Sequence, residues 1–147
     1  LWSGEPFSYD GQFYTIRDVT LRPRPVQRPR IPIWVGGSWP NRGPIRRAAR
    51  WDGFVGGKVH SEDEDWHLTA DEVRALIADI ARQRTAAEPF AIALGGGMRG
   101  DDIVQERERI RAMAEAGATW WMEYVYQEVG DLDAMKARIK EGPVRVE

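Results

Sequence analysis

The fold is decided by the stretch Ile31-Pro32-Ile33-Trp34-Val35-Gly36-Gly37-Ser38-Trp39-Pro40-Asn41-Arg42. Its apolar part, Ile31 to Gly37, is short and does not alternate with polar residues, which is typical of a strand covered on both faces in a parallel sheet. Asn41 then stands at a helix-cap position, and the apolar residues after it share one face, which predicts a helix to about Arg50. A buried strand followed directly by a helix is the repeating unit of an α/β fold.

The rest of the chain repeats this strand and helix order. A capping box at Thr69 and Glu72 begins one helix, which ends near Arg84. Acidic residues at Asp101 and Asp102 begin the next helix, and Gly117 ends it. The last helix is predicted at about 131–141, and the strands between the helices at 52–57, 90–94 and 118–125.

Four strand-helix units predict a parallel sheet with right-handed crossovers. Two architectures fit them, a doubly wound sheet and half of a (β/α)₈ barrel. A complete barrel needs about 250 residues, and this chain of 147 residues is close to the second half of one.

The first 30 residues are expected to be a hairpin and a connector, so that the four units occupy residues 31–147. Asp10-Gly11 lies between aromatic and β-branched residues, a strong hairpin signal. From Leu21 to Pro32, prolines alternate with arginines, a pattern that excludes a helix or a central strand.

Composition excludes several classes of function. The 21 basic and 23 acidic residues leave a net charge of −2, which argues against a nucleic-acid partner. The chain has no cysteine for a disulfide or a thiolate metal site, and no apolar run approaches the roughly 18 residues that span a membrane. We therefore expect a cytoplasmic protein, and the absence of an initiator methionine suggests a processed chain or a fragment.

A phosphate cradle is predicted at Gly36, Gly37, Ser38, Asn41 and Arg42. Glycines between a strand and a helix let the backbone approach an anion, and the hydroxyl, amide and guanidinium groups add donors. A tight turn without a ligand is the alternative interpretation of the same residues.

Three segments of this region, Ile31–Ser38, Arg46–Arg50 and Trp51–Phe54, together resemble strands five and six of luciferase-like monooxygenases and their deazaflavin-dependent relatives. Trp2–Pro6 and Tyr9–Tyr14 resemble the hairpin insertion that precedes strand five in that family. The later segments at 95–97 and 115–121 resemble its last strands.

The resemblance implies the C-terminal half of a TIM (β/α)₈ barrel, strands five to eight, preceded by a β-hairpin insertion. It implies a flavin-dependent oxidoreductase that acts on a small organic substrate, using reduced FMN with oxygen or coenzyme F420 for hydride transfer. In relatives the loop after strand five helps to hold the flavin phosphate, which corresponds here to Gly37, Ser38, Asn41 and Arg42.

The N-terminal half of the family has no counterpart in this chain, so the isolated chain is expected to be inactive. We expect it to pair with such a half or with a second copy of itself. The alternatives are a non-catalytic half-barrel interaction or regulatory module and an unrelated barrel for a phosphorylated metabolite.

Further residues allow two interpretations each. Glu123 is the one charged residue in an apolar strand. It is either buried, with Arg99 or a ligand as its partner, or solvated at the end of the strand. We slightly favour the solvated state. His60 and His67 fit no metal spacing, although a histidine there suits acid-base chemistry, and Lys58 is taken as a surface residue. Tryptophans 34, 120 and 121 are expected in the core, with 120 and 121 on opposite sides of their strand, and tryptophans 39 and 66 are candidates for lining a pocket.

Overall fold

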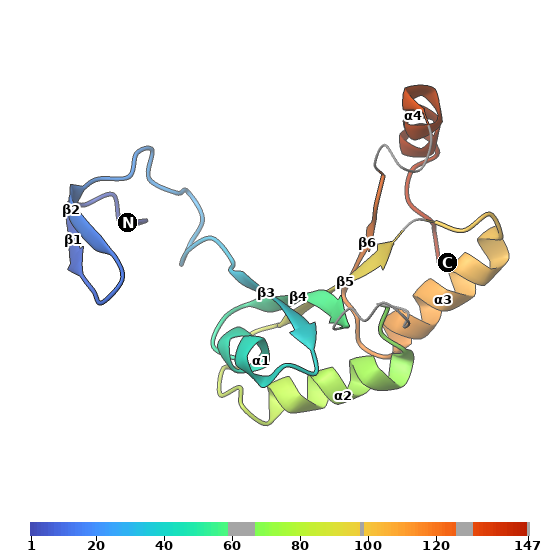
Figure 1. The fold of residues 1–147 in the computed structure, drawn as a ribbon, viewed down its shortest axis with the longest axis horizontal. Coiled ribbons are helices and arrows are strands. Elements are labelled where there is room, and N and C mark those ends of the chain that lie inside the picture. Colours follow the sequence, from blue (N-terminus) through green and yellow to red (C-terminus); the bar gives the residue numbers. More distant parts are fainter. Residues whose placement is uncertain (59–66, 98, 126–130, 147) are drawn as a thin grey trace. The chain divides into compact units, whose positions relative to one another are not determined.

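The computed structural model describes residues 1–58, 67–97, 99–125 and 131–146, in two units, Leu1–Pro32 and Ile33–Glu147. The first unit is built on an antiparallel hairpin of β1 (Phe7–Asp10) and β2 (Thr15–Val19) (Figure 1). The Asp10 carboxylate accepts a hydrogen bond from the Thr15 hydroxyl at 3.1 Å and closes the turn. The hairpin expected at Asp10-Gly11 is therefore present, and residues 20–32 after it form no helix or strand.

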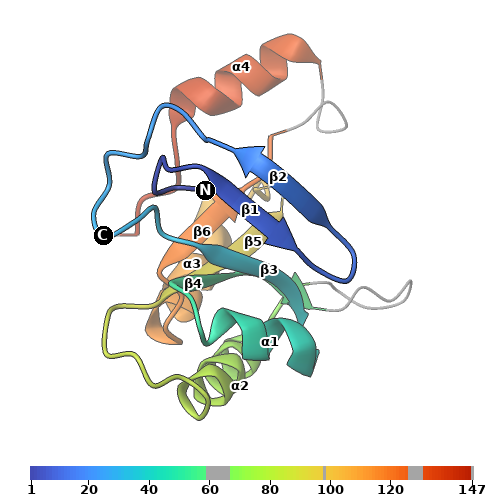
Figure 2. The same ribbon diagram turned by 90° about the vertical axis from the view of Figure 1, so that its left-hand side faces the viewer.

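The second unit contains a parallel sheet of four strands in sequential order. Each strand pairs with the next one along the chain, and a helix follows each of them (Figures 1 and 2). This order confirms the α/β class and the parallel sheet that the sequence predicts. The strands are β3 (Trp34–Trp39), β4 (Gly53–Lys58), β5 (Ala91–Gly97) and β6 (Trp120–Glu123), and the helices are α1 (Arg42–Ala48), α2 (Ala70–Ala81), α3 (Ile103–Glu115) and α4 (Leu132–Glu141).

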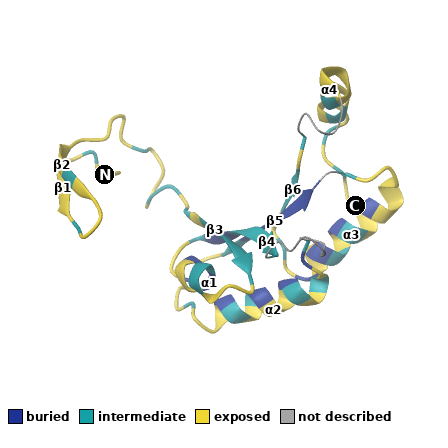
Figure 3. Cartoon of the chain, in the orientation of Figure 1, coloured by how far each residue is buried: buried dark blue, intermediate teal, exposed yellow. Residues whose placement is uncertain are grey.

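The core lies between the sheet and the helices α1, α2 and α3, which share one of its faces (Figures 2 and 3). Phe54 in the middle of β4 is completely buried, and Ile45, Leu76 and Met113 approach it from the three helices. Helix α4 contributes no buried residue. We call the opposite side of the sheet the open face.

Strand β3 begins and ends later than predicted. The first predicted residues, 31–33, lie outside the pairing with β4, which begins at Trp34. Pro32 has no amide hydrogen, and the amide of Ile33 donates to the Asp52 carboxylate at 2.6 Å instead of to a neighbouring strand. Pairing with β4 continues through Ser38 and Trp39. The glycine pair predicted to lie at the turn is therefore part of the strand.

The predicted helix starts are found where a side chain caps amides within three residues of itself. Thr69 and Glu72 form the complete capping box, and Asp102 accepts hydrogen bonds from the amides of residues 104 and 105. Asn41 stands at the cap of α1, but its side chain makes no capping hydrogen bond, and α1 stops at Ala48, short of Arg50. Among the described residues, the helices are too short or too polar to cross a bilayer.

Candidate functional site

The five residues of the predicted cradle lie at the carboxyl end of β3 and the start of α1. Val35 and Trp39 pack against the core, so pleat alternation places Trp34, Gly36 and Ser38 on the open face. A Cβ added to Gly36 would meet no atom within 4 Å. The backbone at this point can therefore be approached closely from the open face.

Gly37 points to the helical side, where its role is packing. A Cβ there would collide with the ring of Pro44 in α1 and lie 3.3 Å from Phe54. A glycine at position 37 is thus explained by the close approach of α1 to β3 and β4, without a bound ligand.

Asn41 and Arg42 are both exposed, and they follow a turn in which the amide of Asn41 donates to the carbonyl of Ser38 at 3.0 Å. Arg42 lines a groove between α1 and α2 on the helical side. The structure therefore places Gly36 and Ser38 on the open face and Arg42 at the mouth of a separate groove. Sequence reasoning missed Arg46 and Arg82, which line the same groove.

At the end of β4, Lys58 forms an ion pair with Glu72 at 3.1 Å, and both side chains are partly buried. The amide of Thr69 donates to the same carboxylate at 2.9 Å. This amide hydrogen bond, with a smaller contribution from Lys58, lowers the pKa of Glu72. Lys58 is thus not the free surface lysine that the sequence suggests.

His67 lines a small cavity beside Gly57 and Leu94, next to the sheet. His60, the acidic residues at 62–65 and Trp66 lie outside the described residues. Within the part of the chain that the structure describes, no three histidine or acidic side chains are grouped as metal ligands.

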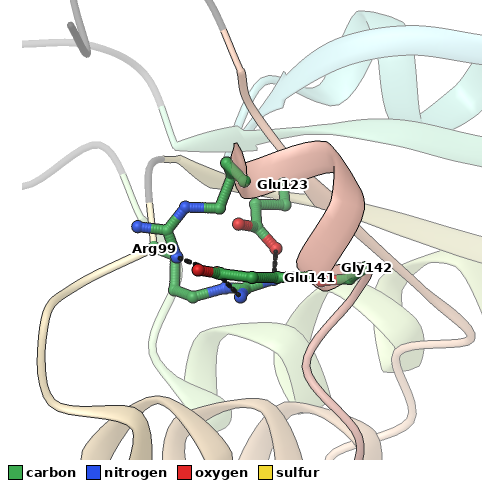
Figure 4. Close-up of polar contacts among 5 residues, drawn as sticks. Arg99, Glu123, Glu141 and Gly142 are labelled. Atoms are coloured by element: carbon green, nitrogen blue, oxygen red, sulfur yellow. Dashed lines mark hydrogen bonds and ion pairs between the residues drawn. The ribbon is translucent and has the colours of Figure 1, made fainter. Parts of the chain in front are cut away.

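Glu123 lies at the end of β6, and its side chain is 17% exposed. Arg99 donates to it at 2.7 Å and also to the carbonyl of Gly142 at 2.7 Å (Figure 4). A longer contact, 3.4 Å, joins Arg99 to Glu141 at the end of α4. The solvated state that we favoured for Glu123 is therefore wrong, and the alternative, burial against Arg99, is confirmed.

Trp120 and Trp121 face opposite sides of the sheet, as predicted. Trp121 packs against the core, with the guanidinium of Arg109 5.0 Å from its ring centre. Trp120 lies on the open face, 57% exposed, and its ring centre is 5.4 Å from that of Trp34. The expectation of core burial is wrong for Trp34 and Trp120, and Trp39, a candidate for a pocket, packs against the core instead.

The family model described as luciferase-like monooxygenase matches residues 1–98, which include the hairpin and strands β3, β4 and β5. The chain belongs to this family. The match confirms the resemblance seen at Ile31–Ser38 and in the residues around it.

Two relatives show the cofactors that such proteins use. The chain is 34% identical over 99 residues to an FMNH2-dependent dimethylsulfone monooxygenase of Pseudomonas putida, covering 65% of this chain and 23% of the relative. It is 42% identical over 79 residues to an F420-dependent glucose-6-phosphate dehydrogenase of Microbacterium testaceum, covering 54% of this chain and 21% of the relative. The chain thus spans less than a quarter of the length of these two relatives. Their cofactors are the two expected from the sequence, FMN and F420.

Proposed function

We propose that this chain is part of a flavin-dependent oxidoreductase of the luciferase-like type and supplies the phosphate end of the cofactor pocket. The observation that carries the proposal is the bare backbone at Gly36, within the segment that the family model matches. The Ser38 hydroxyl lies on the same face of the strand, and Asn41 and Arg42 follow within one turn. When bound, FMN or F420 would supply the redox chemistry.

The residues of the cradle suit a phosphate group. Gly36 lets the phosphate reach the main chain, Ser38 offers a hydroxyl donor, and Arg42 offers a guanidinium without a carboxylate partner on α1. Gly37, within the strand, lets α1 approach β3 closely. These roles are binding and orientation; we assign no catalytic residue to this chain and expect no turnover from it alone.

We further propose that the sheet is the C-terminal half of a (β/α)₈ barrel, strands five to eight. A doubly wound sheet carries helices on both faces, whereas the core elements α1, α2 and α3 share one face here. Sequential strand order and an aromatic contact between the outermost strands support a curled barrel segment. Such a segment needs a partner, either the N-terminal half of a barrel or a second copy.

The cradle is tested by replacing Ser38 with aspartate and titrating FMN and F420. The added charge should repel a phosphate and weaken binding by about 1 to 3 kcal/mol, the scale of a charge-assisted hydrogen bond. Gln12→Asp, on the exposed hairpin turn, makes the same charge change elsewhere and should leave binding unchanged. Unchanged affinity in Ser38→Asp, or no binding of either cofactor by the parent chain, would remove the assignment.

A further inference from the structure

A groove of about 440 Å³ lies between α1 and the end of α2, on the helical side of the sheet. A volume of this size is in the range of small-ligand sites. It lies on the opposite side of the sheet from Gly36 and Ser38, so it is a separate surface from the open face. We call it the arginine groove, and it is lined by Pro40, Arg42, Gly43, Ile45, Arg46, Asp79, Arg82 and Gln83.

Helix α1 brings two positive charges to this groove without a balancing acid. Arg42 and Arg46 are four residues apart and therefore share one face of the helix, where like charges destabilise it slightly. The helix has no acidic residue in its first turn. In contrast, α2, α3 and α4 each contain an arginine paired with a carboxylate three residues away.

Among the described residues, Asp79 is the one carboxylate that lines the groove, and it already has a partner. Asp79 is paired with Arg82 across one turn of α2, and Gln83 donates its side-chain amide to the Asp79 carbonyl at 3.0 Å. The pair nearly cancels its own charge, so the guanidinium groups of Arg42 and Arg46 dominate the potential of the groove. The guanidinium groups of Arg42 and Arg46 match phosphate and carboxylate groups well, because each can donate two parallel hydrogen bonds.

We propose that the arginine groove binds an oligoanion. By this we mean a molecule, or a portion of a larger ligand, that carries at least two phosphate or carboxylate groups. The site goes beyond the proposed cofactor cradle, since Arg46 and Arg82 have no part in that cradle. The anion comes either from a separate phosphorylated or carboxylated molecule or from an extension of the cofactor beyond its phosphate. Arg42 lines the groove and is also the last residue of the cradle.

The test uses the complete 147-residue chain and calorimetric titration with pyrophosphate. We expect one site that weakens as salt is added. Arg46→Gln should reduce the affinity by about tenfold, the effect of one lost charge-assisted contact. Arg82→Gln should also reduce it, because Asp79 would be left in the groove without its partner. The control is Arg107→Gln, which removes an exposed arginine from α3 and should have no effect. No pyrophosphate binding, or an equal loss in the control, would overturn the proposal.

A second arm identifies the source of the anion and rests on the proposed cofactor site. F420 carries carboxylates beyond its phosphate, whereas FMN ends there. If the groove holds an extension of the cofactor, Arg46→Gln weakens F420 binding and leaves FMN binding unchanged; if the anion is a separate molecule, both cofactors bind Arg46→Gln as they bind the parent. Equal weakening of FMN and F420 would make the groove part of the cofactor-phosphate site and overturn its independence. Failure of the Ser38 test alone leaves the pyrophosphate result standing.

Discussion

Replacing Arg99 with methionine should destabilise the second unit by about 3 kcal/mol, because Glu123 would lose its buried partner. The Arg99 side chain is 7% exposed and donates to Glu123 and to the Gly142 carbonyl, each at 2.7 Å. Methionine keeps the apolar stem and removes the guanidinium group. Breaking a buried ion pair from one side costs about 3 to 5 kcal/mol; we expect the lower end because the Glu123 side chain is 17% exposed.

Urea unfolding followed by circular dichroism measures this loss, and a change of about 3 kcal/mol lowers the midpoint by about 1 to 3 M. Arg138→Met is the matched control, since Arg138 lies 3.7 Å from a Glu141 carboxylate that is 61% exposed, and it should cost at most about 1 kcal/mol. The double variant Arg99→Met with Glu123→Met removes both charges and should recover much of the stability. A loss below about 1 kcal/mol in Arg99→Met, or a double variant weaker than Arg99→Met alone, would refute this account.

Three further outcomes are expected. Gly37→Ala should lower the free energy of unfolding by about 1 to 3 kcal/mol because its methyl group meets Pro44, whereas Gly36→Ala, with open space around it, should change little; equal losses on thermal unfolding would contradict this. The pKa of Glu72 is lowered in the folded chain, so its contribution to the free energy of unfolding is complete above the ordinary glutamate pKa and is lost as the pH falls through the lowered one; urea unfolding below the ordinary glutamate pKa should show a smaller loss of stability with falling pH in Glu72→Gln than in the parent, and equal losses would contradict this. Sedimentation of the isolated chain should show a dimer or a larger species, because both edge strands of the sheet offer unpaired backbone groups, and a monomer stable to dilution with a sharp thermal transition would count against the half-barrel.

The sequence predicted best the features that depend on neighbouring residues. The capping box of Thr69 and Glu72 and the aspartate cap at Asp102 need only a few consecutive positions, and both are present. Strand order also follows from local patterns, because each strand is joined to the next by one helix.

Features that depend on distant contacts were predicted less well. The start of β3 depends on Asp52 accepting a hydrogen bond from the amide of Ile33, and Pro44 packs over Gly37 nearer its end. Neither contact is visible in local spacing. Pleat alternation separates Trp120 from Trp121, but it does not say which face the helices will cover. Trp120 was therefore expected in the core, although it lies on the open face.

Some residues of the candidate site could likewise be predicted from their neighbours in the sequence, and others are brought together only by distant contacts. The glycines and donors at the end of β3 and the start of α1 lie close together in the sequence, so the sequence could single them out. Arg82 joins Arg42 in the arginine groove only because α1 packs against α2, and 40 residues of sequence separate the two positions. The one local signal was the pair Arg42 and Arg46, two like charges one turn apart without an acid.

The contact between Trp34 and Trp120 makes the curvature of the sheet observable by spectroscopy. Strands spaced about 4.8 Å apart place β3 and β6 about 14 Å from one another in a flat sheet, yet the two indole centres are 5.4 Å apart at an interplanar angle of 59°. Two indoles this close and inclined couple their electronic transitions and should produce an exciton couplet in the ultraviolet circular dichroism spectrum. Flattening of the sheet would abolish the couplet while the helical signal persists, so one optical band reports the bending of the sheet separately from its folding.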